Sequence, residues 1–247
     1  MVPVRRMVAW LGLACCLAGA GLPVAQAATY RMSTLEWAPY TGADLPGQGF
    51  VSATIRDALA SGGHSVDIRF FPWSRAVYLV DSDPAYMAFY PAYYSRERAA
   101  RYLFSEPVGR STMVFLERVE QPVRWSGYDD LQGLRIGVVR GFVNTEELDS
   151  RIANKTLNAE EAPDDRSNVL KLAAGRVDLA VIDGYVFQHL VRTDAVVAQV
   201  ARRLQANSKV LEVKNLYVCF QRSPAGEAAL RALNTGLRKQ PPRAPTP

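Results

Sequence analysis

The segment YYSRERAARYLFSEPV, residues 93–108, places three arginines and a glutamate in one short turn. A guanidinium presents two parallel N–H donors to the two oxygens of a carboxylate, and it stays charged when it is removed from water. An arginine of this turn could therefore bind an anion between two domains. The alternative is a solvated turn in which Ser95 caps a helix start. The two interpretations are compatible if Arg96 and Arg101 face water while Arg98 faces a cleft.

Other residues that commonly do chemistry do not form recognisable motifs. Gly47 and Gly49 precede a predicted helix, but the third glycine of a dinucleotide fingerprint falls at Ser52. The sequence has no Walker lysine motif, no Gly-x-Ser-x-Gly elbow, and no carboxylate pair marked for acid–base catalysis. The two histidines, His64 and His189, have no nearby cysteine or histidine partner. We therefore expect no metal site and no cofactor.

The first residues predict export. Arg5 and Arg6 precede an apolar run that extends to Val24, and AQA at 25–27 has the small-x-small pattern of a signal-peptidase site. Glycines and a proline interrupt the run, which favours a cleaved signal peptide over a transmembrane helix. We expect residues 1–27 to be removed and the mature chain to lie in the periplasm.

Composition narrows the class of the mature protein. One cysteine, Cys219, follows the predicted cleavage site, so the fold must be held by its core rather than by an internal disulfide. The formal net charge of the whole chain is +5 and its basic residues are spread along the sequence, which argues against nucleic-acid binding. No second apolar stretch is long enough to span a bilayer, so we expect no stable membrane insertion.

Strand-like and helix-like segments alternate, and this predicts an α/β fold with mostly parallel sheets. Two such units are joined by extended segments near Phe115 and Lys214, so a ligand would lie in the crevice between them. The predicted strands are 30–35, 66–71, 86–90, 111–117, 134–139, 178–182 and 209–220. The predicted helices are 50–60, 74–80, 145–153, 167–174, one or two within 185–204, and 225–237.

Three sequence patterns resemble the bacterial periplasmic solute-binding proteins of the polar amino-acid type, family 3, which deliver ligands to ATP-driven importers. In that family a phenylalanine follows the arginine by six residues and precedes Ser-Asp/Glu-Pro; here Phe104 follows Arg98 at that spacing and Ser-Glu-Pro comes next. DLQGLRIGVVRG, residues 130–141, is similar to the start of the family's second lobe. LAAGRVDLAVIDGY, residues 172–185, is similar to its later Gly-x-x-Asp segment.

The resemblance implies an α/β, two-lobed periplasmic-binding-protein-like fold (type II), each lobe a mostly parallel sheet flanked by helices, with two hinge crossings. Lobe 1 would comprise residues 28–115 and 216–240, and lobe 2 residues 116–215. The tail PPRAPTP, residues 241–247, is expected to be disordered. Such a protein would act as a monomer that closes on a small carboxylate-bearing, amino-acid-like solute and passes it to an inner-membrane ABC permease.

The resemblance also implies ligand contacts. The family arginine at the position of Arg98 forms a two-point salt bridge with the ligand carboxylate, and the position of Asp183 receives the ligand ammonium group. Asp183 would equally serve as the cap of a helix that starts at Gly184. Trp37 and Trp73 match residues on either side of the ligand, so together they would form a flat slot for a planar or cationic group. Each tryptophan would equally serve as a core anchor of its lobe.

Several positions depart from the family pattern. Pro91 and Tyr93 stand where hydroxyl residues usually precede the arginine, and Phe142 and Val143 replace the threonines of a Gly-Thr-Thr type segment. These changes weaken the expectation that the ligand is a standard amino acid. We expect Tyr93, Phe142, Val143 and Asn144 to contact the ligand, with backbone N–H groups of the 141–144 loop assisting an anion.

Two other functions remain open. The protein could report ligand to a membrane sensor instead of feeding an importer. Some relatives that share this fold are periplasmic dehydratases acting on prephenate or arogenate, and an aromatic, cationic pocket is compatible with that chemistry. The sequence singles out no carboxylic acid for it, so the leading expectation is a binding protein without enzymatic activity.

Overall fold

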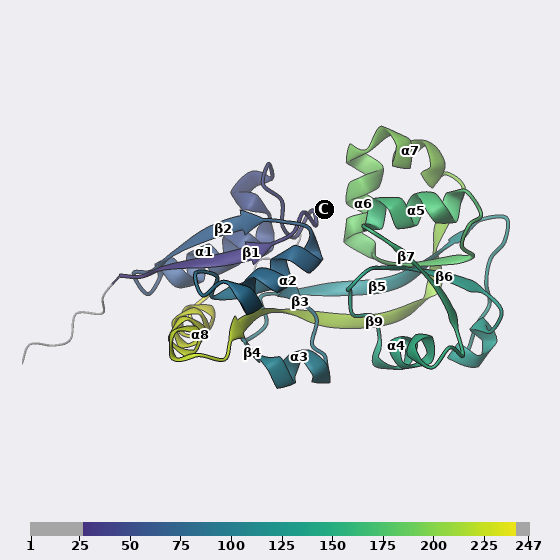
Figure 1. The fold of residues 1–247 in the computed structure, drawn as a ribbon. Helices are drawn as coiled ribbons and strands as arrows, with labels where there is room; N and C mark the ends of the chain where they lie inside the picture. The colour runs from purple at the N-terminus through teal and green to yellow at the C-terminus, as the bar shows by residue number, and fades with distance from the viewer. Residues whose placement is uncertain (1–26, 241–247) are drawn as a thin grey trace, which may run out of the picture.

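The computed structural model describes residues 27–240 (Figure 1). The predicted signal peptide up to residue 26 and the proline-rich tail at 241–247 lie outside the described residues. Across residues 27–240, none of the helices combines the length and the apolar character needed to cross a membrane.

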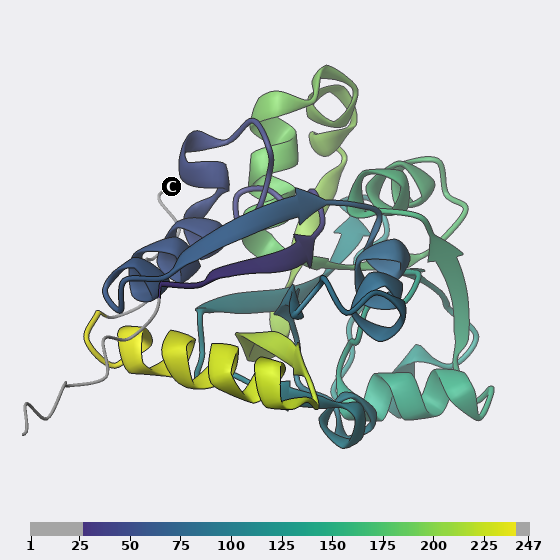
Figure 2. The same ribbon diagram turned by 60° about the vertical axis from the view of Figure 1, so that its left-hand side comes forward.

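Sheet 1 is formed by the first part of the chain together with the end of its last strand. Helices α1 (Phe50–Ala60), α2 (Trp73–Ser82) and α8 (Pro224–Leu237) pack against it, and in Figure 2 the yellow α8 runs beneath its strands. The strand order is β2 (Ser65–Phe70), β1 (Thr29–Thr34), β3 (Ala88–Ala92) and the end of β9 (Leu204–Gln221), with β4 (Tyr102–Phe104) also on β9.

Sheet 2 is formed by the middle of the chain and shares β9 with sheet 1. Figure 1 shows β5 and β9 running between the two sheets, with α5, α6 and α7 on one side of sheet 2 and α4 on the other. The strand order is β9, β5 (Gly109–Arg118), β8 (Leu179–Asp183), β6 (Arg135–Val139) and β7 (Asn158–Ala162). The helices are α4 (Glu146–Ala153), α5 (Asp165–Ala173), α6 (Gly184–Thr193) and α7 (Ala195–Ala201).

The expectation of mostly parallel sheets is wrong. β1 pairs in parallel with β2 and β3, and β6 pairs in parallel with β7 and β8. In the described part of the chain, however, every pair that involves β5 or β9 is antiparallel. The physical reason is that β9 runs against the parallel strands of sheet 1 where it pairs with β3, and β5 runs against the parallel strands of sheet 2 where it pairs with β8.

The predicted elements are observed with shifts of a few residues, and some elements were not predicted. The helical span expected at 185–204 is two helices, α6 and α7. The arginine turn is a short helix, α3 (Arg96–Arg101), whose start is capped because Ser95 Oγ accepts a hydrogen bond from the backbone N–H of Arg98. Strands β4 and β7 were missed, and two short 3-10 turns, Pro46–Gln48 and Tyr128–Leu131, complete the elements.

The core follows the two sheets. Phe89 and Tyr90 are fully buried on β3, and Phe115 is fully buried on β5, where it pairs with Val181 of β8. Cys219 is free and fully buried on β9, which confirms its assignment as a small apolar core residue.

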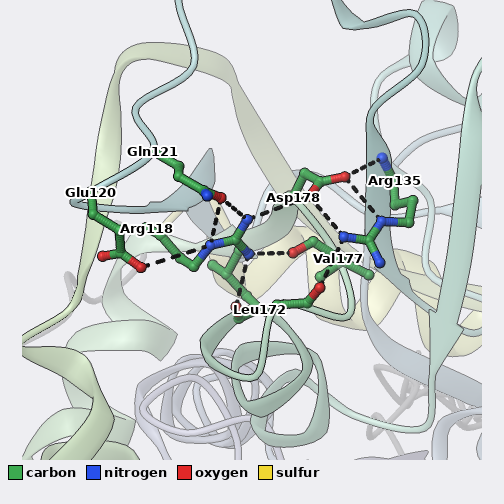
Figure 3. Close-up of polar contacts among 8 residues, drawn as sticks. Arg118, Glu120, Gln121, Arg135, Leu172, Val177 and Asp178 are labelled. Atoms are coloured by element: carbon green, nitrogen blue, oxygen red, sulfur yellow. Dashed lines mark hydrogen bonds and ion pairs between the residues drawn. The ribbon is translucent and has the colours of Figure 1, made fainter.

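A polar network holds the end of sheet 2 where β5 finishes (Figure 3). The Nη1 atom of Arg118 donates to the backbone oxygens of Leu172 at 3.1 Å and Val177 at 2.7 Å. Asp178 lies 3.4 Å from Arg118 and 2.9 Å from Arg135. Hydrogen bonds from Arg135 lower the pKa of Asp178 to about 2. The network therefore ties β5, β6 and the turn before β8 together.

Replacing Asp178 with asparagine is expected to lower the free energy of unfolding by about 1–2 kcal/mol near neutral pH, because a partly screened ion pair is lost. The pKa of Asp178 is depressed in the folded protein, so this stabilisation is present above the unfolded pKa of about 4 and is lost as the pH falls towards about 2. Urea titrations across this pH range measure the difference.

Glu120→Gln is the matched control, because Glu120 is exposed and reaches Arg118 only at 4.0 Å. Its effect should stay below about 0.5 kcal/mol. If the difference in unfolding free energy between wild type and Asp178→Asn did not become smaller at acidic pH, the depressed pKa of Asp178 would be contradicted.

Candidate functional site

The predicted ligand residues meet between sheet 1 and sheet 2. Trp37, Trp73 and Arg98 come from sheet 1 and its helices, whereas Phe142 and Asp183 follow or end strands of sheet 2. Two cavities of about 20 Å³ each lie among these side chains. Each has room for about one water molecule. The residues that line both cavities are Trp37, Tyr93, Phe142 and Val143.

Arg98 is held by neutral partners. Its Nη1 atom donates to the backbone oxygen of Tyr93 at 3.2 Å and its Nη2 atom to that of Gly141 at 3.1 Å. Its Cζ atom lies 5.3 Å from the centre of the Trp73 ring. Among residues 27–240, no carboxylate forms an ion pair with this guanidinium. Burial lowers the pKa of Arg98 from its ordinary value, but an arginine side chain stays charged in proteins.

The two neighbouring arginines behave differently from Arg98. The Arg96 side chain is 85% exposed and lies 3.3 Å from Glu146 on α4. Arg101 pairs with Asp81 at 2.7 Å on the surface of sheet 1. The expectation that Arg96 and Arg101 face water is confirmed, and α3 turns the third arginine inward.

Trp73 and Trp37 each make one polar contact across to sheet 2. Trp73 Nε1 donates to the backbone oxygen of Gly141 at 2.9 Å. Trp37 Nε1 donates to Oδ2 of Asp165 at 3.0 Å. One face of the Trp37 ring stacks on Tyr40, with ring centres 4.3 Å apart. Both tryptophans are nearly buried.

The two tryptophans do not enclose an open flat slot, and that expectation is corrected. The ring of Phe142 lies between them, 6.3 Å from the centre of Trp37 and 6.1 Å from the centre of Trp73. Both contacts are edge-on, at interplanar angles of 84° and 83°. The sequence showed only that Phe142 replaces a small hydroxyl residue; its long side chain fills the space that a threonine would leave.

Both carboxylate oxygens of Asp183 accept hydrogen bonds from other groups of the protein. Its Oδ1 atom accepts from the N–H groups of Tyr185 and Val186 and so caps α6. Its Oδ2 atom accepts from Tyr40 Oη at 2.8 Å, and also from the Ser111 hydroxyl and the Thr112 N–H. The capping interpretation of Asp183 is therefore confirmed. The Tyr40 contact adds a link from sheet 1 that the sequence did not indicate.

Tyr93 lies in the same network as Asp183. Its hydroxyl shares a short hydrogen bond with Ser111, which donates onward to Asp183. Its backbone oxygen accepts a hydrogen bond from Arg98, and the Nζ atom of Lys214 lies 5.5 Å from the centre of its ring. Tyr93 thus lines the two cavities with its ring while its polar atoms bind protein partners.

The loop that follows β6 contacts the site with side chains more than with N–H groups. Phe142 N–H donates to Val139, and Asn144 donates from both its backbone and its side chain to Asp149. The expectation that this loop's N–H groups assist an anion is therefore wrong for Phe142 and Asn144. Val143 lines the cavities with an apolar side chain.

Asp165 is a site residue that sequence analysis missed. It is buried at the start of α5, lines the second cavity beside Asp183, and accepts from Trp37. Burial, with a further contribution from the nearby charge of Asp183, raises the pKa of Asp165 to about 7. Its sequence context, PDDRS, is that of an ordinary helix start, so no local signal distinguished it from Asp164.

The site therefore has two chemically different ends. Arg98 supplies a positive charge at one end, and Asp165 supplies a titratable carboxyl at the other. Aromatic side chains separate them. No group of three or more His, Cys, Asp or Glu side chains that could hold a metal occurs within the described residues.

Comparisons with known proteins agree with this architecture. No protein-family model and no curated protein matches the chain. The structure resembles a histidine kinase sensor domain described as similar to periplasmic binding proteins, at 21% identity, covering 85% of this chain and 90% of that chain with a TM-score of 0.73.

Amino-acid-binding proteins are also among the solved structures that match. Holo ArgBP from T. maritima matches at 17% identity over 85% of this chain and 89% of that chain, with a TM-score of 0.69. The GluR0 ligand-binding core from Nostoc punctiforme, in complex with L-glutamate, matches at 15% identity over 85% and 93%, with a TM-score of 0.63. These neighbours are binding proteins rather than enzymes. At such identities they show the periplasmic-binding-protein-like fold alone.

Replacing Asp183 with alanine is expected to destabilise the protein by about 2–4 kcal/mol without any ligand, because a helix cap is lost and buried donors lose their acceptor. Chemical denaturation measures this. Asp194→Ala is the matched control, since Asp194 caps α7 from a more exposed position, and it should cost clearly less than Asp183→Ala does. An Asp183→Ala variant as stable as wild type would contradict the scaffold role.

Asp165→Asn is expected to remove a pH dependence of stability. Because the pKa of Asp165 is raised in the folded protein, the folded state is penalised as the pH rises from about 4 to about 7, where the buried carboxyl must ionise. The penalty is as much as roughly 4 kcal/mol, at about 1.36 kcal/mol for each pKa unit. Asparagine stays neutral, so the variant should gain stability relative to wild type at mildly alkaline pH.

Unfolding free energies of both proteins on either side of neutral pH measure this gain. Asp44→Asn, at an exposed loop position, is the control and should follow wild type. If the unfolding free energies of wild type and Asp165→Asn changed with pH in parallel, Asp165 would not be a buried titrating group.

Proposed function

We propose that this protein binds a small carboxylate-bearing, amino-acid-like solute between two lobes that close over it. Lobe 1 comprises residues 28–115 and 216–240, built on sheet 1, and lobe 2 comprises residues 116–215, built on sheet 2. The observation that carries the proposal is Arg98, a partly buried cation at the junction of the two sheets whose described partners are carbonyl oxygens and an indole ring. A ligand carboxylate would satisfy both donors of its fork.

The contacts between the lobes suit reversible closure. Apart from the edge-on contacts of Phe142 with Trp37 and Trp73, they are single polar contacts from separate side chains, and water can replace each of these when the lobes part. The residue pairs are Arg98 and Trp73 with Gly141, Trp37 with Asp165, Tyr40 with Asp183, and Arg96 with Glu146. Closure around a ligand is the motion that hinged binding proteins use.

The hinge follows from the path of the two crossing strands. Phe115 pairs within sheet 2, so we place the flexing part of β5 before it, around Gly109 to Ser111. Residues 112–115 would then move with lobe 2, and lobe 1 would end earlier than the expected residue 115. These residues pair with Leu216 to Lys214 of β9. Both crossings then bend at the same level, which allows one lobe to rotate about a single axis.

The end of the site opposite Arg98 would complete recognition of an amino-acid-like ligand. Asp183 already accepts from several protein donors, so we propose that Asp165 receives the ligand's cationic group. An arriving cation would favour the ionised form of this carboxyl. The solved neighbours with this fold include proteins bound to arginine and to glutamate, which supports a zwitterionic ligand class for this chain.

Delivery to an inner-membrane ABC permease by a monomeric periplasmic protein is the role that we propose. The predicted signal peptide and the match to amino-acid-binding proteins support it. A second candidate is the reporting of ligand to a membrane sensor. The match to a histidine kinase sensor domain, with a TM-score of 0.73, favours it.

Co-purification from membranes distinguishes the two roles. The importer role predicts that the ligand-loaded protein captures a multi-spanning permease, and the sensor role predicts that it captures a kinase-bearing receptor. A third outcome, conversion of prephenate to an aromatic product on incubation with the protein, would replace both roles with the dehydratase hypothesis.

Arg98→Ala is expected to weaken binding by about 3–5 kcal/mol, as when one partner of a buried ion pair is removed. A thermal-shift screen of amino acids, opines, polyamines and small organic acids identifies the ligand, and calorimetry measures the loss. Ligand at about 100 times its Kd should stabilise the wild type by about 2.7 kcal/mol.

Arg96→Ala is the matched control for this measurement. Arg96 lies two residues away on the same helix, faces water and forms only an exposed ion pair, so its removal should change Kd by no more than a few-fold. If Arg98→Ala bound the ligand as well as Arg96→Ala does, Arg98 would not be the carboxylate contact.

A further inference from the structure

The loop at Gly141 and Phe142 contacts the residues that are proposed to hold the ligand. Gly141 has a φ of +74°, so the chain turns sharply after β6. Its carbonyl oxygen accepts from both Trp73 Nε1 at 2.9 Å and Arg98 Nη2 at 3.1 Å. A Cβ at Gly141 would lie 3.4 Å from the Trp73 ring, so the loop packs closely against lobe 1. One carbonyl oxygen from lobe 2 therefore occupies donors of Arg98 and Trp73 at the cationic end of the site.

The next side chain occupies the aromatic part of the site. The Phe142 ring contacts Trp37 and Trp73 edge-on and lines both small cavities. It also lines a wider groove that opens between Trp37, Phe71 and α6. Phe142 thus lies, with Trp37, on the boundary between the inner cavities and the outer groove.

We infer that the Gly141–Phe142 loop is a built-in occupant of the site, meaning that it fills the place of the ligand when no ligand is bound. We also infer that the ligand which replaces it is an aromatic carboxylate. This inference rests on the proposed function and adds the class of solute. The loop presents an acceptor oxygen to Arg98 and Trp73 and places a planar ring between two tryptophans. A ligand that displaces the loop must offer the same two features to keep the same partners.

The covalent structure of the loop indicates the spacing of these features. The peptide nitrogen, Cα and Cβ of Phe142 separate the carbonyl carbon of Gly141 from the ring. An aryl group joined to a carboxylate by a link of about two or three atoms, each step near 1.5 Å, spans the same interval. A carboxylate also improves on a peptide carbonyl, because it brings a charge and a second oxygen to a guanidinium that has no anionic partner within residues 27–240.

The aromatic environment favours a ring over an aliphatic chain. Edge-on contacts between aromatic rings add roughly two- to tenfold each to an interaction beyond the area that they bury. Two tryptophans offer two such contacts. An aliphatic acid of equal length would keep the Arg98 contact and lose both ring contacts.

The ligand series that tests the inference is 3-phenylpropanoate, 4-phenylbutanoate and L-phenylalanine against hexanoate and L-arginine, with Kd measured by calorimetry. We expect at least one aromatic acid to bind about tenfold or more tightly than hexanoate. Phe142→Ala should tighten its binding several-fold further, because the competing ring is gone. In the ligand-free protein, small-angle scattering should show that Phe142→Ala is more open than wild type.

Tyr78→Ala is the control, since it also removes an aromatic ring but from a side chain that is 58% exposed on α2. It should leave both affinity and scattering unchanged. Thermal unfolding of each variant confirms that it is folded, and Phe142→Leu, which keeps an apolar side chain of similar length, provides a second variant if alanine destabilises the loop.

The results separate this inference from the proposed function. Equal affinity for aromatic and aliphatic acids, both lost in Arg98→Ala, would overturn the aromatic inference and leave the carboxylate-binding function standing. Weaker binding in Phe142→Ala would overturn the built-in-occupant role by making Phe142 an ordinary ligand contact. No binding of any carboxylate in an Arg98-dependent manner would overturn both.

Discussion

A partly buried guanidinium without a carboxylate partner among the described residues is the constraint on which the site depends. Arg98 is turned inward by a short capped helix and held by two carbonyl oxygens and an indole ring, one of those carbonyls coming from the opposite sheet. Removing a charge from water is costly unless it is paired. The structure keeps this charge at the junction of two sheets that share strand β9, where movement of one sheet changes what the charge contacts.

The two buried carboxylates of the site differ in their roles: Asp183 belongs to the scaffold, and Asp165 is the one proposed to recognise the ligand. Asp183 joins the start of α6 to β5 through its hydrogen bonds and also accepts from Tyr40 across the junction, so its acceptors are used by the protein's own donors. Asp165 accepts from Trp37 and has a pKa raised to about 7 by burial. A carboxyl with that pKa can change its charge when a cation or a change of pH alters its surroundings.

Local patterns in the sequence predicted most elements, the buried Cys219 and the capped arginine turn, because each depends on residues close in the chain. The antiparallel role of β9 was missed since it depends on pairing with distant strands. Strand β7, NAEEA, lacks an apolar pattern and forms because it pairs with β6. Asp165 and Phe142 become site residues only when the fold brings them to Trp37, more than a hundred residues away in sequence, and no local signal carries that information.

A crystal structure of the protein with its bound ligand tests the central claim most directly. The account predicts a ligand carboxylate on both terminal nitrogens of Arg98, with the Gly141 oxygen displaced from the guanidinium and the two lobes closed over the ligand. A ligand bound elsewhere on the protein, with Arg98 still bonded to the carbonyls of Tyr93 and Gly141, would contradict it.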